Sequence, residues 1–221
     1  MRTLLLLFVP VLLLWSCKKD DTIPANEDVT QGSRWGIIIG STPEQVYQQL
    51  QTLQEPLHVS SVYQVPLMQY EKIMDFKSDP ALYKQCHIHG IDSAGVVSID
   101  YDQSITKIRW SGPDGNYSLD KWPSNTDEYF AVGDAAAVIK AKMSKIFNKW
   151  PYNGRYEIAL GSKPLSAGFD EEMKKWNMWQ FTASALVNAE AFGTYIVSLY
   201  FSGGKLSRIN IQYTQSPVII E

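Results

Sequence analysis

The chain is poor in cysteine and in histidine. Its 221 residues include two cysteines, Cys17 and Cys86, and three histidines. If Cys17 is committed to another role, Cys86 has no partner, which excludes a fold stapled by disulfides. The chain also lacks a large excess of charge of either sign: it has 20 Lys and Arg against 23 Asp and Glu, and a formal net charge of −3. Phosphate binding needs a basic patch, so this balance argues against nucleic acid as a partner.

Motifs for catalysis and for phosphate binding are also missing. Gly203 and Gly204 are typical of a turn, and the segment GDAAA at 133–137 lacks the lysine and the spacing of a phosphate-binding loop. Glu171 and Glu172 are adjacent and would face apart on a helix, which disfavours a two-carboxylate site. An enzyme assembled from residues distant in sequence stays open. We nevertheless expect no enzyme and no cofactor.

The cluster Cys86-His87-Ile88-His89 is the nearest approach to a metal site. On a strand, His87 and His89 point to one face, whereas Cys86 and Ile88 point to the other. Two histidines are short of the three or four protein ligands that zinc needs, even if His58 could join them. We therefore predict a strand with Cys86 and Ile88 in the core, and no metal site.

Only one long apolar run is present, at residues 4–15, and a single basic residue, Arg2, precedes it. A membrane-spanning helix needs about 20 apolar residues. A basic start followed by a short apolar stretch is typical of a secretory signal peptide, which we place at 1–16. We expect the remaining residues to form one large domain or two small ones.

The end of this run, Leu14-Trp15-Ser16-Cys17, resembles the bacterial lipobox, which implies lipidation of Cys17 and a membrane anchor through acyl chains. An ordinary signal peptide cut elsewhere is the alternative. The following Lys19, Asp20 and Asp21 resemble the signal that exports lipoproteins of the Bacteroidetes group to the cell surface, which implies an outer-membrane location. Residues 17–33 are polar and short of aromatics, and are predicted to form a flexible tether.

Two stretches of the chain share a pattern. Gly40 and Gly133 each precede a predicted helix, with apolar residues at spacings of three and four. Ser41 or Thr42 is expected to cap the first helix, and Asp134 the second. Predicted hairpins begin near residues 95 and 195, and further strands are expected at 60–65, 82–89, 155–160 and 179–187, with a helical turn at 169–176.

These patterns predict an α+β fold of two tandem repeats, each a short N-terminal helix followed by an antiparallel sheet that ends in a β-hairpin. The first repeat spans 34–111 and the second 129–221, with a linker at 112–128. Gly40, Thr42, Gln45 and Val46, together with a hairpin of the type LYFSGGKLSRI, resemble the domain shared by β-lactamase inhibitor proteins and the small lipoprotein of the outer-membrane β-barrel assembly complex. Tandem duplication is closest to the inhibitor proteins.

Aromatic residues are the candidates for binding, because tryptophan and tyrosine concentrate at interface hot spots. Tyr200 should lie on the strand face opposite Leu199 and Phe201. The tryptophans in or beside predicted loops are Trp122, Trp150, Trp176 and Trp179. The competing interpretation is that most of these rings pack the seam between the repeats.

We therefore expect a cell-envelope lipoprotein that acts as a protein-binding or inhibitory module, as the inhibitor resemblance implies. A structural accessory of an outer-membrane complex is the second hypothesis, implied by the assembly lipoprotein. A glycan-binding or hydrolytic component of a nutrient-uptake system is the third.

Overall fold

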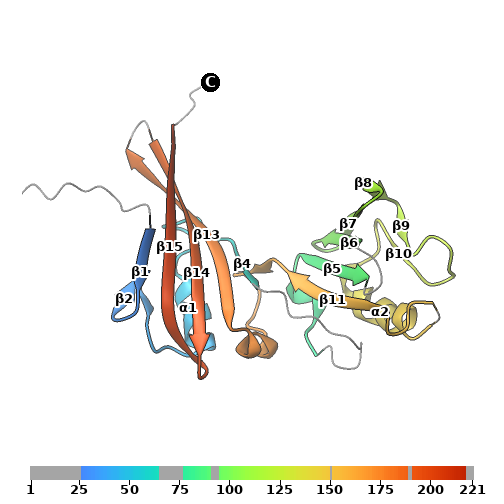
Figure 1. Ribbon diagram of the computed structural model, residues 1–221, viewed down its shortest axis with the longest axis horizontal. Coiled ribbons are helices and arrows are strands. Elements are labelled where there is room, and N and C mark those ends of the chain that lie inside the picture. Colours follow the sequence, from blue (N-terminus) through green and yellow to red (C-terminus); the bar gives the residue numbers. More distant parts are fainter. Residues whose placement is uncertain (1–25, 65–76, 91–94, 150, 189–190, 218–221) are drawn as a thin grey trace, which may run out of the picture.

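The computed structural model describes residues 26–64, 77–90, 95–149, 151–188 and 191–217. The predicted signal peptide, the lipidation site Cys17, the export signal Lys19-Asp20-Asp21 and Trp150 lie outside the described residues. In the described part, the chain forms two lobes that lie side by side (Figure 1). We call them the terminal lobe (26–64 and 163–217) and the inserted lobe (80–161).

The terminal lobe is built on a six-stranded antiparallel sheet in the order β1-β15-β14-β13-β4-β12. These strands are β1 (Asn26–Val29), β4 (Ser61–Gln64), β12 (Lys163–Pro164), β13 (Met178–Asn188), β14 (Ala191–Ser202) and β15 (Lys205–Pro217). Helix α1 (Pro43–Gln51) lies behind this sheet in Figure 1. The lobe also contains β2 (Ser33–Arg34), β3 (Ile37–Ile38) and the 3-10 helix η4 (Glu171–Lys175).

The inserted lobe is one continuous segment of chain between β4 and β12. Its five-stranded antiparallel sheet has the order β11-β5-β6-β7-β8. These strands are β5 (Gln85–Gly90), β6 (Val96–Tyr101), β7 (Ile105–Gly112), β8 (Gly115–Leu119) and β11 (Tyr156–Gly161). The same lobe holds helix α2 (Ile139–Phe147), the short pair β9 (Lys121–Trp122) and β10 (Phe130–Ala131), and the 3-10 helices η2 (Pro80–Leu82) and η3 (Ala136–Val138).

The two helices begin differently. Thr42 and Gln45 form a capping box at the start of α1, with Pro43 in the first turn, so the predicted cap is confirmed. The prediction that Asp134 caps the second helix is wrong. Its carboxylate accepts a hydrogen bond from Ala131 N and pairs with Lys142, while α2 begins only at Ile139, after η3.

The predicted fold class is wrong. The described residues are mostly antiparallel sheet with only two short α-helices, and neither predicted repeat forms a unit of its own. Instead, α1 and β4 join β13, β14 and β15, whereas α2 and β11 join β5, β6 and β7. Each helix thus lies with strands that were predicted for the other repeat. Main-chain hydrogen bonds between distant segments hold this arrangement: Gly40 N donates to Leu206 O at 2.8 Å, and Gly133 N donates to Ile105 O at 2.8 Å.

Two predicted irregular segments carry ordered structure. The predicted linker at 112–128 contains β8 and β9. The later part of the predicted tether contains β1, which pairs with β15 from Asn26 to Val29. Backbone pairing at a sheet edge therefore orders a polar stretch whose composition predicted flexibility.

Alternation along the strands was predicted correctly. Val97 and Ile99 are fully buried on one face of β6, and Cys86 and Ile88 are fully buried on the same side of β5. One continuous hydrophobic cluster runs through both lobes. At their junction, Tyr83 packs against Trp176, with ring centroids 6.2 Å apart. The sheets are therefore held in a shared core, which gives their open faces a rigid support.

Candidate binding surface

The side of the six-stranded sheet that faces away from α1 is the main candidate surface; we call it the open face. It is the face opposite the buried side chains of Trp179, Leu199 and Ile209. Cross-strand register aligns one row of side chains across five strands of this face: Tyr63, Gln180, Ser198, Asn210 and Asp28. Gln180 Nε2 donates to Ser198 Oγ at 3.3 Å, and Asn210 Nδ2 donates to Asp28 Oδ1 at 3.1 Å. The row is thus a polar band held by its own hydrogen bonds.

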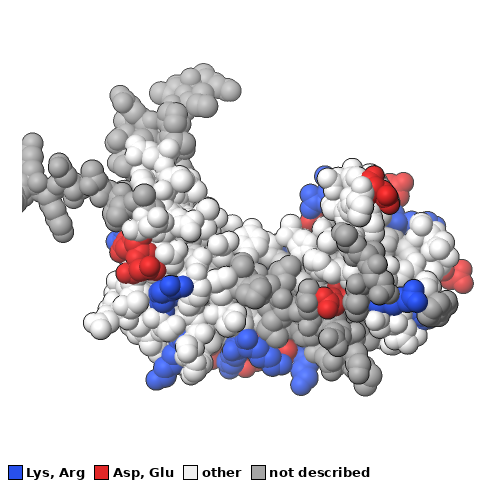
Figure 2. Space-filling view, viewed as in Figure 1, with Lys and Arg blue, Asp and Glu red and all other residues white. Residues whose placement is uncertain are grey.

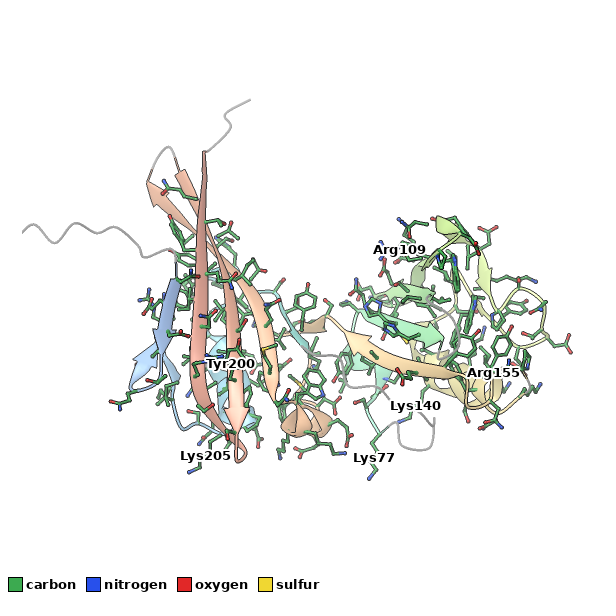
Figure 3. The ribbon with its side chains drawn as sticks, in the orientation of Figure 1. Lys77, Arg109, Lys140, Arg155, Tyr200 and Lys205 are labelled. Atoms are coloured by element: carbon green, nitrogen blue, oxygen red, sulfur yellow. The ribbon has the colours of Figure 1, made fainter. Side chains whose placement is uncertain are left out.

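Tyr200 lies on the open face, opposite the fully buried Leu199, as its position in the strand predicts. The guanidinium of Arg208 lies 3.9 Å from the centroid of the Tyr200 ring. A cation at this distance over an aromatic face is attracted by the ring quadrupole, so each side chain restrains the other. Tyr200 also lines a shallow pocket of about 320 Å³ together with Asn177, Met178 and Phe201. Figure 3 labels Tyr200 on the terminal lobe.

Two large apolar side chains are exposed beside this pair. Tyr63 and Ile196 each leave 40% of their surface exposed. Ile196 and Tyr200 flank Ser198 on β14, and Tyr63 lies in the Ser198 row two strands away, which is about 10 Å at the usual strand spacing. The open face therefore brings three large side chains into one patch. Figure 2 shows the terminal lobe with most of the viewed face uncharged, and the surface hollowed between the two lobes.

The described candidate tryptophans lie in the core. Trp122 is 8% exposed, Trp176 is 4% exposed and Trp179 is fully buried. The Trp122 ring stacks on Phe130 with centroids 6.4 Å apart, and Trp176 meets Trp179 edge-on. These three rings are buried, but not in a seam between two tandem repeats, because those repeats do not form: Trp122 packs within the inserted lobe. The three tryptophans therefore do not belong to the candidate surface.

The histidine pair lies on the outer side of the inserted lobe's sheet. His87 and His89 share a face with ring centroids 6.4 Å apart, and His87 Nδ1 is 3.0 Å from Ser98 Oγ. Burial lowers the pKa of His87, and the nearby His89 lowers it further. Cys86 is fully buried on the other side, which raises the pKa of its thiol. Within the described residues, no group of three or more His, Cys, Asp or Glu is placed to hold a metal ion.

A buried lysine at the lobe junction was not predicted. Lys163 is fully buried, and its Nζ donates to Gly168 O at 2.6 Å and to Tyr47 Oη at 3.1 Å. Close by, Tyr83 donates to the buried Asp170 carboxylate at 2.6 Å. Burial lowers the Lys163 pKa to about 8, with Asp170 acting in the opposite direction. Nothing in the sequence around Lys163 and Pro164 signals burial, and its contacts join β12 to α1.

Comparison with known proteins adds no relative. No protein-family model matches the chain, and no curated protein or solved structure matches it either. Among the described residues, no helix has the length and apolar character needed to cross a bilayer.

Proposed function

We propose that this protein is a lipid-anchored protein of the cell envelope that binds another protein through the open face of its six-stranded sheet. The observation that carries this function is the patch formed by Tyr63, Ile196 and the stacked Tyr200–Arg208 pair. Tyrosine and arginine are enriched among the residues that dominate protein–protein affinity.

One part of the patch, the Tyr200–Arg208 pair, is already ordered before any partner binds. Tyr200 and Arg208 lie opposite each other on the paired strands β14 and β15 and are already stacked. Ordering a free side chain on binding costs on the order of 0.5 to 1.5 kcal/mol. Because Tyr200 and Arg208 are already ordered, this cost is reduced for both of them. This preorganisation favours a macromolecular partner that lays a complementary surface across the strands.

The polar row makes the surface selective for particular protein partners. Gln180 and Asn210 present amide groups between the apolar side chains, on either side of the buried Ser198. The hydrogen bonds along the row use one side-chain N–H of Gln180 and one of Asn210. A partner without donors and acceptors for the other atoms of these two amides would leave them unpaired, and each buried unpaired group costs about 1 to 3 kcal/mol. The apolar patch thus supplies affinity, and the row restricts which protein can bind, as expected of a recognition or inhibitory module.

The anchor follows from the first residues of the chain. Residues 4–15 and Cys17 support export and lipidation, and Lys19, Asp20 and Asp21 support transfer to the cell surface. Two acyl chains are enough for stable attachment, at about 0.8 kcal/mol for each buried methylene. The open face is then presented to proteins in or outside the outer membrane.

Affinity capture from cross-linked cells tests this function. The tagged full-length protein should recover one dominant protein, and the double variant Ile196→Asp, Tyr200→Ala should recover at least tenfold less of it. A Cys17→Ala chain is the control for anchoring. Equal recovery by the double variant would overturn the role of the open face. Loss of recovery upon adding polysaccharide would instead favour a glycan-binding protein, and a stoichiometric outer-membrane complex would favour the accessory role.

A further inference from the structure

Strand β8 is an outer edge of the five-stranded sheet. It pairs with β7 on one side, and no main-chain hydrogen bond joins its five residues to any other described part of the chain. The two-residue loop Pro113–Asp114 closes the β7–β8 hairpin between Gly112 and Gly115. Such a closing pair is hydrogen-bonded, and hydrogen-bonded pairs alternate with open ones along an antiparallel ladder. The main-chain N–H and C=O groups of Asn116 and Ser118 therefore point away from β7.

This edge lacks the usual protection against strand pairing. Natural edges are blocked by charged side chains or proline. The edge strand β1 carries Glu27 and Asp28, and the edge strand β12 carries Pro164. By contrast, β8 reads GNYSL, without charge or proline, and its three central residues are exposed. The edge is thus chemically open to one more strand.

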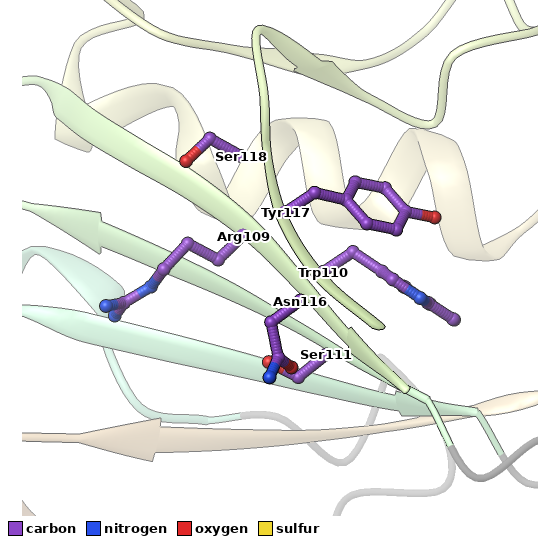
Figure 4. A pocket seen from close by; sticks show the side chains of 6 residues that line it. All are labelled: Arg109, Trp110, Ser111, Asn116, Tyr117 and Ser118. Atoms are coloured by element: carbon purple, nitrogen blue, oxygen red, sulfur yellow. The ribbon is translucent and has the colours of Figure 1, made fainter. Parts of the chain in front are cut away.

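Side chains on both faces of the hairpin offer contacts to an added strand. Trp110 and Tyr117 are directly opposite each other and project to one side, while Arg109 and Ser118 project to the other (Figure 4). Tyr117 is 50% exposed, and the hairpin residues line a shallow pocket of about 230 Å³. An extended peptide places alternate side chains on the two faces of the sheet that it joins, so both sets of contacts can be used at once.

Charge at the ends of β8 restricts the partner further. Asp114 and Asp120 lie just before and just after the strand, and both are exposed. Neither forms an ion pair with another described residue. One lies in the hairpin loop and the other directly after the strand, so they flank the five residues of β8. A peptide with an uncharged centre and a basic residue near each end complements this arrangement.

We infer that β8 is a docking edge for an extended segment of a protein partner, uncharged over about five residues and flanked by lysine or arginine. The segment adds to the sheet as a sixth strand, hydrogen-bonded to Asn116 and Ser118. This edge belongs to the inserted lobe and is separate from the open face of the terminal lobe. It deepens the proposed protein-binding function by naming the form and charge of a second contact.

Peptide selection on the full-length protein tests the inference. A phage library of random twelve-residue peptides should yield binders with basic residues flanking an uncharged stretch. Ser118→Pro removes the outward N–H at a position where an edge strand tolerates proline, and it should weaken these binders by at least tenfold. Ser118→Ala keeps the N–H and should change binding less than twofold. The double variant Asp114→Asn, Asp120→Asn should weaken binding by about threefold to tenfold.

Hydrogen exchange in the wild-type protein tests the same contact without the proline variant, which could fail to fold. In the wild-type protein, a selected peptide should slow exchange of the Asn116 and Ser118 amides. Binders that leave these amides unchanged, or a selection no richer on wild type than on Ser118→Pro, would overturn the inference. Concentration-dependent dimerisation that Ser118→Pro abolishes would assign the edge to a second copy of this chain instead. Because variants of the open face are not involved, these results are independent of the capture experiment.

Discussion

The ammonium group of Lys163 lies 3.1 Å from the hydroxyl oxygen of Tyr47, inside the core at the junction of the lobes. Neither side chain has appreciable exposed surface. The Tyr47 hydroxyl donates in turn to Pro164 O at 2.7 Å, so the two residues connect α1 with β12. A buried lysine is costly to keep charged, and this cost makes the stability of the protein depend on pH.

The titration of Lys163 should make the free energy of unfolding rise with pH between about 8 and 10.5. The folded protein releases the Lys163 proton at about pH 8, whereas an exposed lysine releases it at 10.5. The unfolded chain therefore holds more protons over this window, and the free energy of unfolding rises with pH. We expect the difference in unfolding free energy between wild type and Lys163→Met to increase by about 2 to 3 kcal/mol from pH 7 to pH 10.

Urea unfolding of both proteins at several pH values measures this difference. Burial raises the Tyr47 pKa from 10.0 to about 12. In the unfolded chain Tyr47 therefore titrates near the top of this window, but both proteins contain it, so its contribution cancels in the difference. Lys205→Met is the matched control, because Lys205 is exposed at the β14–β15 turn, and the corresponding difference should stay small. A wild-type to Lys163→Met difference that is constant with pH would show that Lys163 is not buried as a charged group.

The lack of a side chain at Gly95 leaves room for the Trp110 ring of the β7–β8 hairpin. A Cβ at Gly95 would lie 2.1 Å from the Trp110 ring, so the ring or the strand must move. We expect Gly95→Ala to destabilise the protein by about 1 to 3 kcal/mol, the usual cost of overpacking. Gly168→Ala is the control, since nothing lies within 4 Å of its Cβ position. Equal unfolding free energies for the two variants would contradict the described position of the Trp110 ring.

The local structure could be predicted because it depends on neighbouring residues. The Thr42–Gln45 capping box, the buried alternation of Val97 and Ile99, and the orientation of Tyr200 follow from spacing alone. The arrangement of the lobes depends on distant pairing. The hydrogen bond from Gly40 to Leu206 joins segments that are far apart in the chain, and no local pattern reveals that pairing. The tandem-repeat prediction failed at this step.

The candidate site was predictable only in part, for a similar reason. A tryptophan beside a predicted loop can be exposed or buried according to what packs on it from elsewhere. Trp122 meets Phe147 of α2 and Tyr156 of β11, so it is enclosed by segments that follow it in the chain. The stacking of Arg208 on Tyr200 and the burial of Lys163 likewise depend on strand register.

Site-specific photo-cross-linking in living cells tests the central claim most directly. A photoreactive benzoylphenylalanine in place of Thr182 would sit on the open face, opposite Ile196, and the same group in place of the exposed Val138 serves as the control. We predict one cross-linked protein of defined mass from position 182 that is not formed from position 138. No product from position 182, or the same products from both positions, would contradict binding through the open face.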